Sequence, residues 1–122
     1  MPSHNTLEAF IACVEANRHV EAIEAYYAPE ASMQENELPP RCGRDTLVAH
    51  ERAVLARTRS VRSTCVRPVF TAGDRVVIRW VFEFEGADGT STRLDELAWQ
   101  RWDGERIAEE QFFYDPAQRK PG

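Results

Sequence analysis

Hydrophobic residues in the first half of the sequence recur at the spacing of amphipathic helices. The pattern predicts helices ending near residue 17, over residues 20–27 and over residues 44–59. Ser3 or Asn5 is placed to cap the first helix, and Pro29 to stop the second. The hydrophobic positions are Leu7, Phe10, Ile11 and Val14, then Val20, Ile23, Ala25 and Tyr27, and finally Leu47, Val48, Val54 and Leu55.

From about residue 61 the hydrophobic period changes to two, which is typical of strands. Strands are predicted over residues 31–37, 61–71, 75–85, 90–102 and 106–114, with turns at residues 73–74, 86–89 and 103–104. Three helices followed by an antiparallel meander indicate an α+β fold, with the helices packed on a strongly curved sheet. Such a sheet buries its apolar face or encloses a pocket with it.

The chain has 122 residues, which fits one domain over residues 1–116 with a flexible C-terminal tail over residues 117–122. Three cysteines without close spacing (Cys13, Cys42 and Cys65) argue against a disulfide framework and a cysteine-rich zinc site. Cys13 and Cys65 fit small buried apolar residues, whereas Cys42 is a weak candidate nucleophile in a loop. A cytoplasmic protein is the simplest interpretation.

Charge and hydropathy exclude two classes of partner. The net charge of −5 does not suit binding to nucleic acid through phosphate neutralisation. No apolar run approaches the roughly 18–20 residues of a membrane span. Nine of the twelve aromatic residues lie at or after Phe70, so the predicted sheet carries most of the aromatic core.

Four stretches of the sequence resemble the nuclear-transport-factor-2-like fold, which includes ketosteroid isomerases and SnoaL-like polyketide cyclases. They cover nearly the whole chain, in the family's order: VEAIEAYYAPEASMQE (residues 20–35), PPRCGRDTLVAH (39–50), GDRVVIRWVFEF (73–84) and LDELAWQRWDGERIAEEQFFYDP (94–116). The resemblance implies a cone-shaped cavity between sheet and helices, and a homodimer through the outer sheet face. It does not fix an activity, because this fold hosts both enzymes and non-catalytic binders.

Glu35 is the first candidate catalytic residue. The resemblance places it on the strand that carries the general base of ketosteroid isomerases, with Glu37 as a weaker alternative. At the mouth of an apolar cavity, loss of solvent is expected to raise the pKa of such a carboxyl. The position of the isomerase's first-helix tyrosine falls near Ile11, which has no hydroxyl, so steroid isomerisation is disfavoured.

Asp95 and Glu96 are adjacent, so in a strand they face opposite sides and only one can reach the cavity. Asp95 shares a face with Leu97 and Trp99, and Glu96 with Leu94 and Ala98. Both faces are partly apolar, and the pattern does not decide which is internal. Either carboxyl is a candidate acid or base, although pairing with an arginine such as Arg79 or Arg93 is the commoner role.

In the last predicted strand, Glu110, Phe112 and Tyr114 share a face that the resemblance points into the cone. Tyr114 would then supply a hydroxyl donor near the opening, and Asp115 is a further candidate acid. His50 lies beside the apolar face of the third helix, while His4 and His19 are expected to be exposed. No histidine pair has metal-ligand spacing, so no metal is expected. Glycine-rich phosphate or dinucleotide motifs are absent, and no cofactor is expected.

These residues favour binding of a small apolar or polycyclic ligand, with or without acid/base isomerase, cyclase or dehydratase chemistry. The alternative is a non-catalytic carrier or a dimeric interaction module. The candidate catalytic residues are Glu35, Asp95, Glu96 and Tyr114. The expected ligand-binding residues are Phe10, Val14, Tyr27, His50, Trp80, Phe82, Phe84, Trp99, Glu110 and Phe112.

Overall fold

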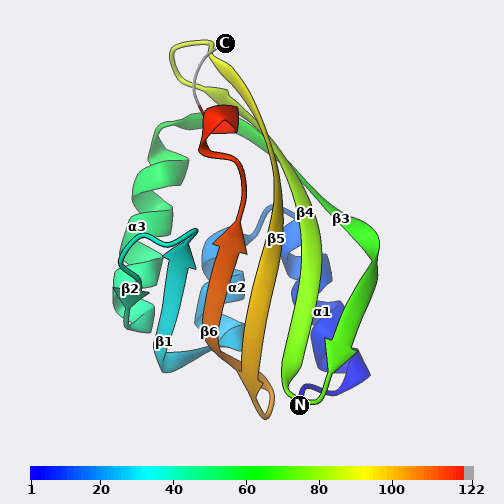
Figure 1. Ribbon diagram of the computed structural model, residues 1–122. Helices are drawn as coiled ribbons and strands as arrows, with labels where there is room; N and C mark the ends of the chain where they lie inside the picture. The colour runs from blue at the N-terminus through cyan, green and yellow to red at the C-terminus, as the bar shows by residue number, and fades with distance from the viewer. Residues whose placement is uncertain (120–122) are drawn as a thin grey trace.

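A computed structural model describes residues 1–119 and has three helices covering one face of a curved, six-stranded sheet (Figure 1). The predicted α+β fold is therefore confirmed. The elements are α1 (His4–Glu15), α2 (His19–Tyr26), β1 (Tyr27–Glu35), β2 (Arg41–Cys42), α3 (Arg44–Ala56), β3 (Thr58–Ala72), β4 (Arg75–Gly86), β5 (Ser91–Asp103), β6 (Arg106–Phe113) and the short 3-10 helix η1 (Pro116–Arg119).

The strands follow the order β2-β1-β6-β5-β4-β3 across the sheet. All neighbouring strands are antiparallel except β1 and β6, which run parallel although they lie far apart in the sequence. The register shifts between Val66 and Phe70 on β3, and between Arg101 and Trp102 on β5. Such bulges increase local twist and bend strands, which accounts for the strong curvature of the sheet.

Local sequence signals explain the helix boundaries. The Ser3 hydroxyl accepts a hydrogen bond from the Thr6 N–H at 3.1 Å and caps α1, as predicted. Helix α2 ends at Tyr26, and β1 begins at Tyr27, four residues before the predicted strand. Pro29 therefore lies inside β1 rather than only ending a helix.

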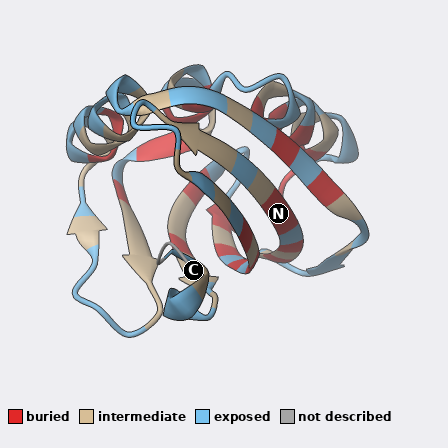
Figure 2. Ribbon diagram, turned by 90° about the horizontal axis from the view of Figure 1, so that it is seen from above, coloured by how far each residue is buried: buried red, intermediate tan, exposed pale blue. Residues whose placement is uncertain are grey.

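The core lies between the helices and the concave face of the sheet, where Figure 2 shows the buried residues. The Phe10 ring on α1 meets the Trp102 ring on β5 edge-on, with centroids 5.8 Å apart. Full burial of a side chain such as Phe10 stabilises the fold by roughly 1.5–3 kcal/mol relative to its exposure to water. Residues 117–119 of the expected tail form most of η1, and residues 120–122 of that tail lie outside the described part.

Candidate functional site

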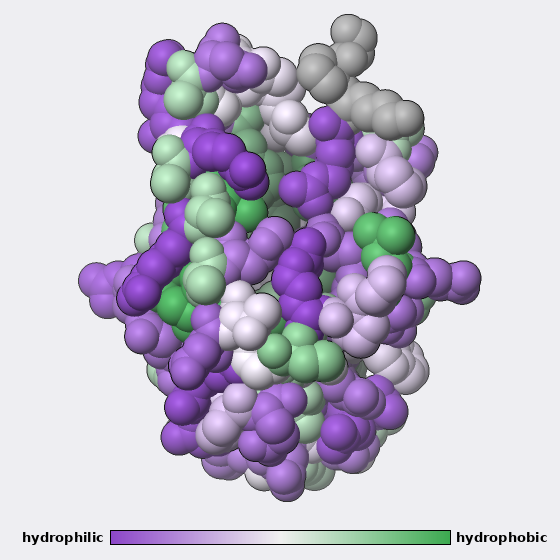
Figure 3. All heavy atoms as spheres, turned by 90° about the vertical axis from the view of Figure 1, so that its left-hand side faces the viewer, coloured by the Kyte–Doolittle hydropathy of each residue, from purple (hydrophilic) through white to green (hydrophobic). Residues whose placement is uncertain are grey.

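A cavity of about 150 Å³ lies between the concave sheet and the helices. Its wall is mostly apolar, and Figure 3 shows a recess with hydrophobic atoms inside a hydrophilic rim. Nine of the ten expected ligand-binding residues line it, namely Phe10, Val14, Tyr27, His50, Trp80, Phe82, Phe84, Glu110 and Phe112. An incompletely filled apolar space with a few polar groups is the usual form of a small-molecule site.

Adjacent residues of β5 face opposite sides of the sheet, so only one of the two candidate carboxyls enters the cavity. Glu96 points into the cavity and is 7% exposed. Asp95 faces the other side, where Arg79 donates hydrogen bonds to it at 3.0 and 2.7 Å. Trp99 shares this outer face and is 44% exposed. The predictions of Asp95 as a cavity acid and of Trp99 as a lining residue are therefore wrong. The sequence misled here because the outer face of β5 is partly apolar and resembles an inner face.

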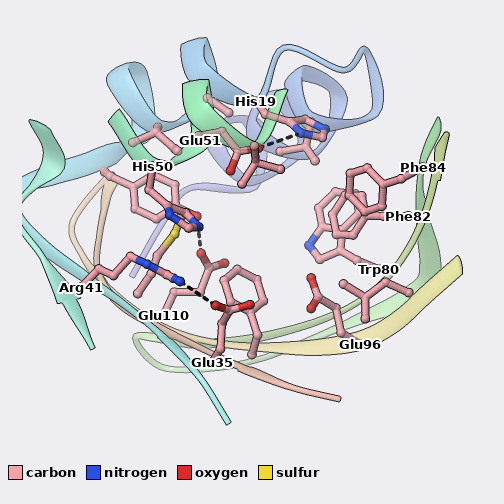
Figure 4. Close-up of a pocket in the computed structure, with 18 of the residues that line it drawn as sticks. His19, Glu35, Arg41, His50, Glu51, Trp80, Phe82, Phe84, Glu96 and Glu110 are labelled. Atoms are coloured by element: carbon pink, nitrogen blue, oxygen red, sulfur yellow. Dashed lines mark hydrogen bonds and ion pairs between the residues drawn. The ribbon is translucent and has the colours of Figure 1, made fainter. Parts of the chain in front are cut away.

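Glu96 differs from the other carboxyls of the cavity in its hydrogen bonding. In the described part of the chain it accepts no hydrogen bond from the protein. Burial, followed by the charges of Glu110 and Glu35, raises the pKa of Glu96 to about 8. Its cross-strand neighbour is Trp80, so the carboxyl lies beside an aromatic wall (Figure 4). Near neutral pH this group carries a proton and faces the cavity.

Glu110 is buried in the wall of the same cavity and is held in place by two donors. The Tyr27 hydroxyl donates to one carboxylate oxygen, and the Gln100 amide donates to the other at 2.6 Å. The Trp102 indole N–H in turn donates to the Gln100 carbonyl at 2.9 Å, which fixes the direction of the amide. Burial raises the pKa of Glu110 to about 7, although the hydrogen bonds from Gln100 and Tyr27 oppose the shift.

Glu35 lies at the mouth of the cavity among cationic and hydroxyl donors. Arg41, Tyr114 and Arg119 donate hydrogen bonds to its carboxylate at 2.8, 2.8 and 2.7 Å. Burial alone would raise the pKa of Glu35, but these donors outweigh it and the pKa lies below its ordinary value. The expected rise in pKa is therefore wrong for this residue, since the sequence did not reveal that Arg41 and Arg119 converge on it.

The C-terminal turn holds Arg119 at this mouth. The Gln118 side chain accepts a hydrogen bond from the Asp95 N–H at 2.8 Å and donates one to the Asp95 carbonyl at 3.1 Å. Arg119 also donates to the Tyr114 hydroxyl at 3.2 Å. Tyr114 is half-buried and reaches the site through Glu35, but its side chain is not part of the cavity wall.

Helices α2 and α3 add two polar residues that sequence reasoning missed. His19, expected to be exposed, is 9% exposed and lines the cavity together with Glu51. Its ring lies 3.3 Å from the Glu51 carboxylate and 2.8 Å from the Ser63 hydroxyl. The local sequence around His19 carries little indication of this burial, because His19 follows a turn. Its burial is explained by Glu51 and Ser63, which are distant in the sequence.

Two further features bear on cofactors and membranes. Within residues 1–119, no three histidine, cysteine, aspartate or glutamate side chains are grouped so that they could hold a metal ion. Over the same residues, the helices are too short or too polar to cross a bilayer.

Cys65 is buried, as expected, whereas Cys13 is half-buried and Cys42 is exposed.

Comparisons with known proteins bear on the family and the fold. The model of a family described as SnoaL-like domain matches residues 7–110. A comparison with curated proteins finds no match.

Solved structures show the same fold at low sequence identity. An NTF2-like protein of unknown function from Burkholderia pseudomallei is 17% identical, with a TM-score of 0.80 over 94% of this chain and 92% of that chain. A hypothetical protein with a ketosteroid isomerase-like fold from Catenulispora acidiphila, in complex with trimethylamine, is 19% identical, with a TM-score of 0.78 over 95% of this chain and 89% of that chain. A protein from Mesorhizobium loti described as a putative SnoaL-like polyketide cyclase is 18% identical, with a TM-score of 0.74 over 90% and 97%.

Proposed function

The chain belongs to the family of SnoaL-like domains, and we propose that its cavity binds a small aromatic or polycyclic ligand and exchanges protons with it. One observation carries this proposal. Glu96 is a buried carboxylic acid without a hydrogen-bond partner among the described residues, and it faces an aromatic cavity. Every fully enclosed side-chain polar atom of the described residues has a partner, so the Glu96 oxygens, which have none, are open to the cavity, where a ligand oxygen can bond to them.

The aromatic wall suits a flat ligand. Trp80 and Phe82 are stacked, with ring centroids 5.6 Å apart and planes 20° apart, and Phe84 follows at 6.0 Å. These rings project from alternate positions of β4 toward the cavity (Figure 4). A planar apolar ligand lying against them would place its polar edge near Glu96, because Glu96 is the cross-strand neighbour of Trp80.

The protonated form of Glu96 supplies a donor that the first helix lacks. Ile11 is buried and has no hydroxyl, so α1 cannot stabilise a developing enolate from that position. A neutral carboxylic acid can donate its proton to a carbonyl or hydroxyl oxygen of the ligand. Isomerisation, cyclisation and dehydration each contain such a step, and none of them requires a cofactor.

Exchange of an acidic C–H proton tests the proposal directly. The probe is α-tetralone, a bicyclic ketone whose C–H bonds next to the carbonyl exchange slowly in D₂O. We expect the protein to accelerate exchange measured by ¹H NMR, and Glu96→Gln to reduce kcat by about 100-fold or more. Glu83→Gln is the matched control, since this glutamate is exposed on β4. Absence of exchange by the unaltered protein, or full activity of Glu96→Gln, would contradict the proposal.

A non-catalytic carrier is the second candidate function. The lowered pKa of Glu35 favours it, because the expected base is already neutralised by Arg41 and Arg119. A carrier would quench Trp80 fluorescence on binding α-tetralone without accelerating exchange. Tight binding together with unchanged exchange would therefore select the carrier.

We further propose a homodimer through the outer face of the sheet. Leu97, Trp99 and Phe113 are 46%, 44% and 45% exposed and lie on the convex face of neighbouring strands. The register pairs Leu97 with Phe113, so the exposed side chains form a contiguous apolar patch. Such a patch rimmed by charge is typical of a protein interface.

A further inference from the structure

The cavity has more acidic than basic groups in its lining. Four of the lining residues are glutamates and two are arginines. Both arginines, Arg41 and Arg119, bond to the same glutamate, Glu35, at 2.8 and 2.7 Å. The other glutamates form no ion pair with an arginine or lysine within residues 1–119; they are Glu51, Glu96 and Glu110. The acidic excess therefore belongs to the walls of the cavity rather than to its mouth.

Glu96 is the member of this acidic group that has no partner. It is 7% exposed, points into the cavity and accepts no hydrogen bond from residues 1–119, so its oxygens are open to the cavity. Glu110, in contrast, has a donor on each carboxylate oxygen, from Tyr27 and from Gln100. A buried carboxyl that lacks a donor and faces open space can bind a ligand that brings N–H donors of its own.

The aromatic wall supplies a second attraction for a positive charge. Trp80 is the antiparallel cross-strand neighbour of Glu96, so their Cβ atoms lie about 5 Å apart. Phe82 stacks on Trp80, with ring centroids 5.6 Å apart. A cation is attracted to an aromatic ring when it lies within about 6 Å of the ring centroid, and tryptophan attracts it most strongly. A cation bonded to Glu96 would lie beside these rings.

Figure 4 separates the basic side of the cavity from its aromatic side. Arg41 and Glu35 lie together on one side, whereas Glu96 lies with Trp80 on the other. Glu51 projects from the helical cover above them. A cation beside Glu96 would therefore leave the ion pair of Arg41 with Glu35 in place.

The electrostatic environment of Glu96 is that of a carboxyl without a counter-cation. Burial, followed by the charges of Glu110 and Glu35, raises the pKa of Glu96 to about 8, and the charge of Glu51 adds to the shift. The charge of Arg119 opposes the shift and is outweighed. A cationic ligand would act in the same direction as Arg119 and favour the ionised carboxylate.

We propose that the ligand of the cavity is a protonated aliphatic amine carried on an aromatic or polycyclic frame, with its N–H group bonded to Glu96 and its charge beside the aromatic wall. This inference rests on the proposed function, because it names the class of ligand that the same cavity takes. An alkyl ammonium group has a pKa near 10.4, as in the lysine side chain, so the ligand is a cation at neutral pH.

Binding of such a ligand is accompanied by the release of one proton. The ligand enters as R–NH₃⁺, the O–H bond of Glu96 breaks, and the proton passes to water. The carboxylate keeps the electron pair of that bond and accepts a hydrogen bond from the ammonium group. The ligand brings one positive charge and the departing proton removes one, so the total charge of the cavity is unchanged.

Calorimetric titration with an amine and its neutral counterpart tests the ligand class. The probes are 2-aminotetralin and tetralin-2-ol, which share a bicyclic frame and differ in charge. We expect the amine to bind about 10-fold or more tightly than the alcohol at pH 8. Glu96→Gln should raise the Kd of the amine by about 10- to 100-fold and that of the alcohol by less than about threefold. Glu83→Gln, exposed on β4, is the matched control and should bind both probes as the unaltered protein does.

Proton release can be measured on the unaltered protein alone. Titrations of 2-aminotetralin in buffers that differ in heat of ionisation count the protons released. We expect about one at pH 7 and close to none at pH 9, because Glu96 is then already ionised in the free protein. The affinity for the amine should rise by about 10-fold or more from pH 6 to pH 8, for the same reason.

Other groups in the cavity could also release protons, and Glu96→Gln separates them from Glu96. The titratable and charged residues that line the cavity with Glu96 are His19 on α2, Tyr27 and Glu35 on β1, Arg41 on β2, His50 and Glu51 on α3, Glu110 on β6 and Arg119 on η1. In Glu96→Gln the proton released at pH 7 should be lost. Its persistence in this variant would show that another group is the partner of the ammonium and would overturn the inference.

Failure of this inference can be told apart from failure of the proposed function. Equal affinity for the amine and the alcohol, or amine binding without proton release at pH 7, would overturn the inference. If α-tetralone exchange is accelerated at the same time, the proposed function still stands. Absence of that exchange would overturn the proposed function itself.

Discussion

The Tyr27 hydroxyl donates a hydrogen bond to the Glu110 carboxylate across the parallel pair of strands β1 and β6. Both side chains are almost fully buried. Burial, reinforced by the charge of Glu110, raises the pKa of Tyr27 well above its ordinary value. The hydroxyl therefore stays protonated and remains a donor whenever Glu110 is ionised.

Removing this hydroxyl should destabilise the protein. Tyr27→Phe leaves one oxygen of a buried carboxylate without its donor, and we expect the free energy of unfolding to fall by about 1–3 kcal/mol at neutral pH. Urea unfolding followed by tryptophan fluorescence measures the change. Tyr26→Phe is the control, because Tyr26 is only half-buried. Equal stability of the two variants would show that the Tyr27–Glu110 bond does not stabilise the fold.

Stability should fall as pH rises from about 5 to above 8. The pKa values of Glu96 and Glu110 are raised to about 8 and about 7, so the folded protein holds protons that the unfolded chain has already lost. Their contribution is complete below the unfolded pKa and disappears as pH passes the folded pKa. The slope is up to about 1.4 kcal/mol per pH unit for each group. Urea unfolding at a series of pH values measures it.

Glu96→Gln isolates half of that effect. The amide resembles the protonated acid in shape but cannot ionise, so the variant should match the original protein near pH 5 and exceed its stability at pH 9. Glu83→Gln is the control, because Glu83 is exposed. A decline with pH as steep as that of the unaltered protein would contradict the raised pKa of Glu96.

Arg119→Ala should open the mouth of the cavity at little cost in stability. Arg119 is 48% exposed at its side chain, and pairs at such exposure are typically worth less than about 1 kcal/mol. Loss of its charge and hydrogen bond should raise the pKa of Glu35 and remove the side chain from the mouth, while Gln118 still holds η1 on β5. Stopped-flow fluorescence should show faster association of α-tetralone. Arg62→Ala on the exposed side of β3 is the control, and identical association rates for both variants would exclude the gating role.

The apolar patch on the outer face of the sheet leads us to expect a homodimer. Leu97→Glu places a charge in the centre of the proposed interface and should convert a dimer into a monomer in analytical ultracentrifugation, since a buried unpaired charge is costly. Ser91→Glu, exposed further along β5, should leave the dimer intact. A monomeric unaltered protein at micromolar concentration would contradict the proposal.

The elements that the sequence predicted best are those with a single clear apolar face. Strand β4 shows period-two hydrophobicity, and Trp80, Phe82 and Phe84 line the cavity as expected. Strand β5 could not be oriented from its pattern, because Leu97 and Trp99 make its outer face as apolar as its inner one. Only the pairing with β4 and β6 decides that Glu96 lies inside.

The polar part of the site was hidden because it depends on contacts between distant residues. Glu35 was found from its position on β1, but its electrostatic state depends on Arg119, which is 84 residues away. His19 was expected to be exposed because local sequence could not reveal Ser63, 44 residues away. Single-sequence patterns report burial periodicity well and report long-range hydrogen bonds poorly.

The parallel pairing of β1 with β6 has a consequence for the order of assembly during synthesis. Besides β6, the sheet partner of β1 is the two-residue strand β2, so the first half of the chain cannot complete its sheet when it leaves the ribosome. The apolar faces of its helices therefore stay exposed until β6 has been synthesised. A nascent chain halted before residue 106 would therefore be a ready substrate for chaperones, and the cavity forms only once that strand joins β1.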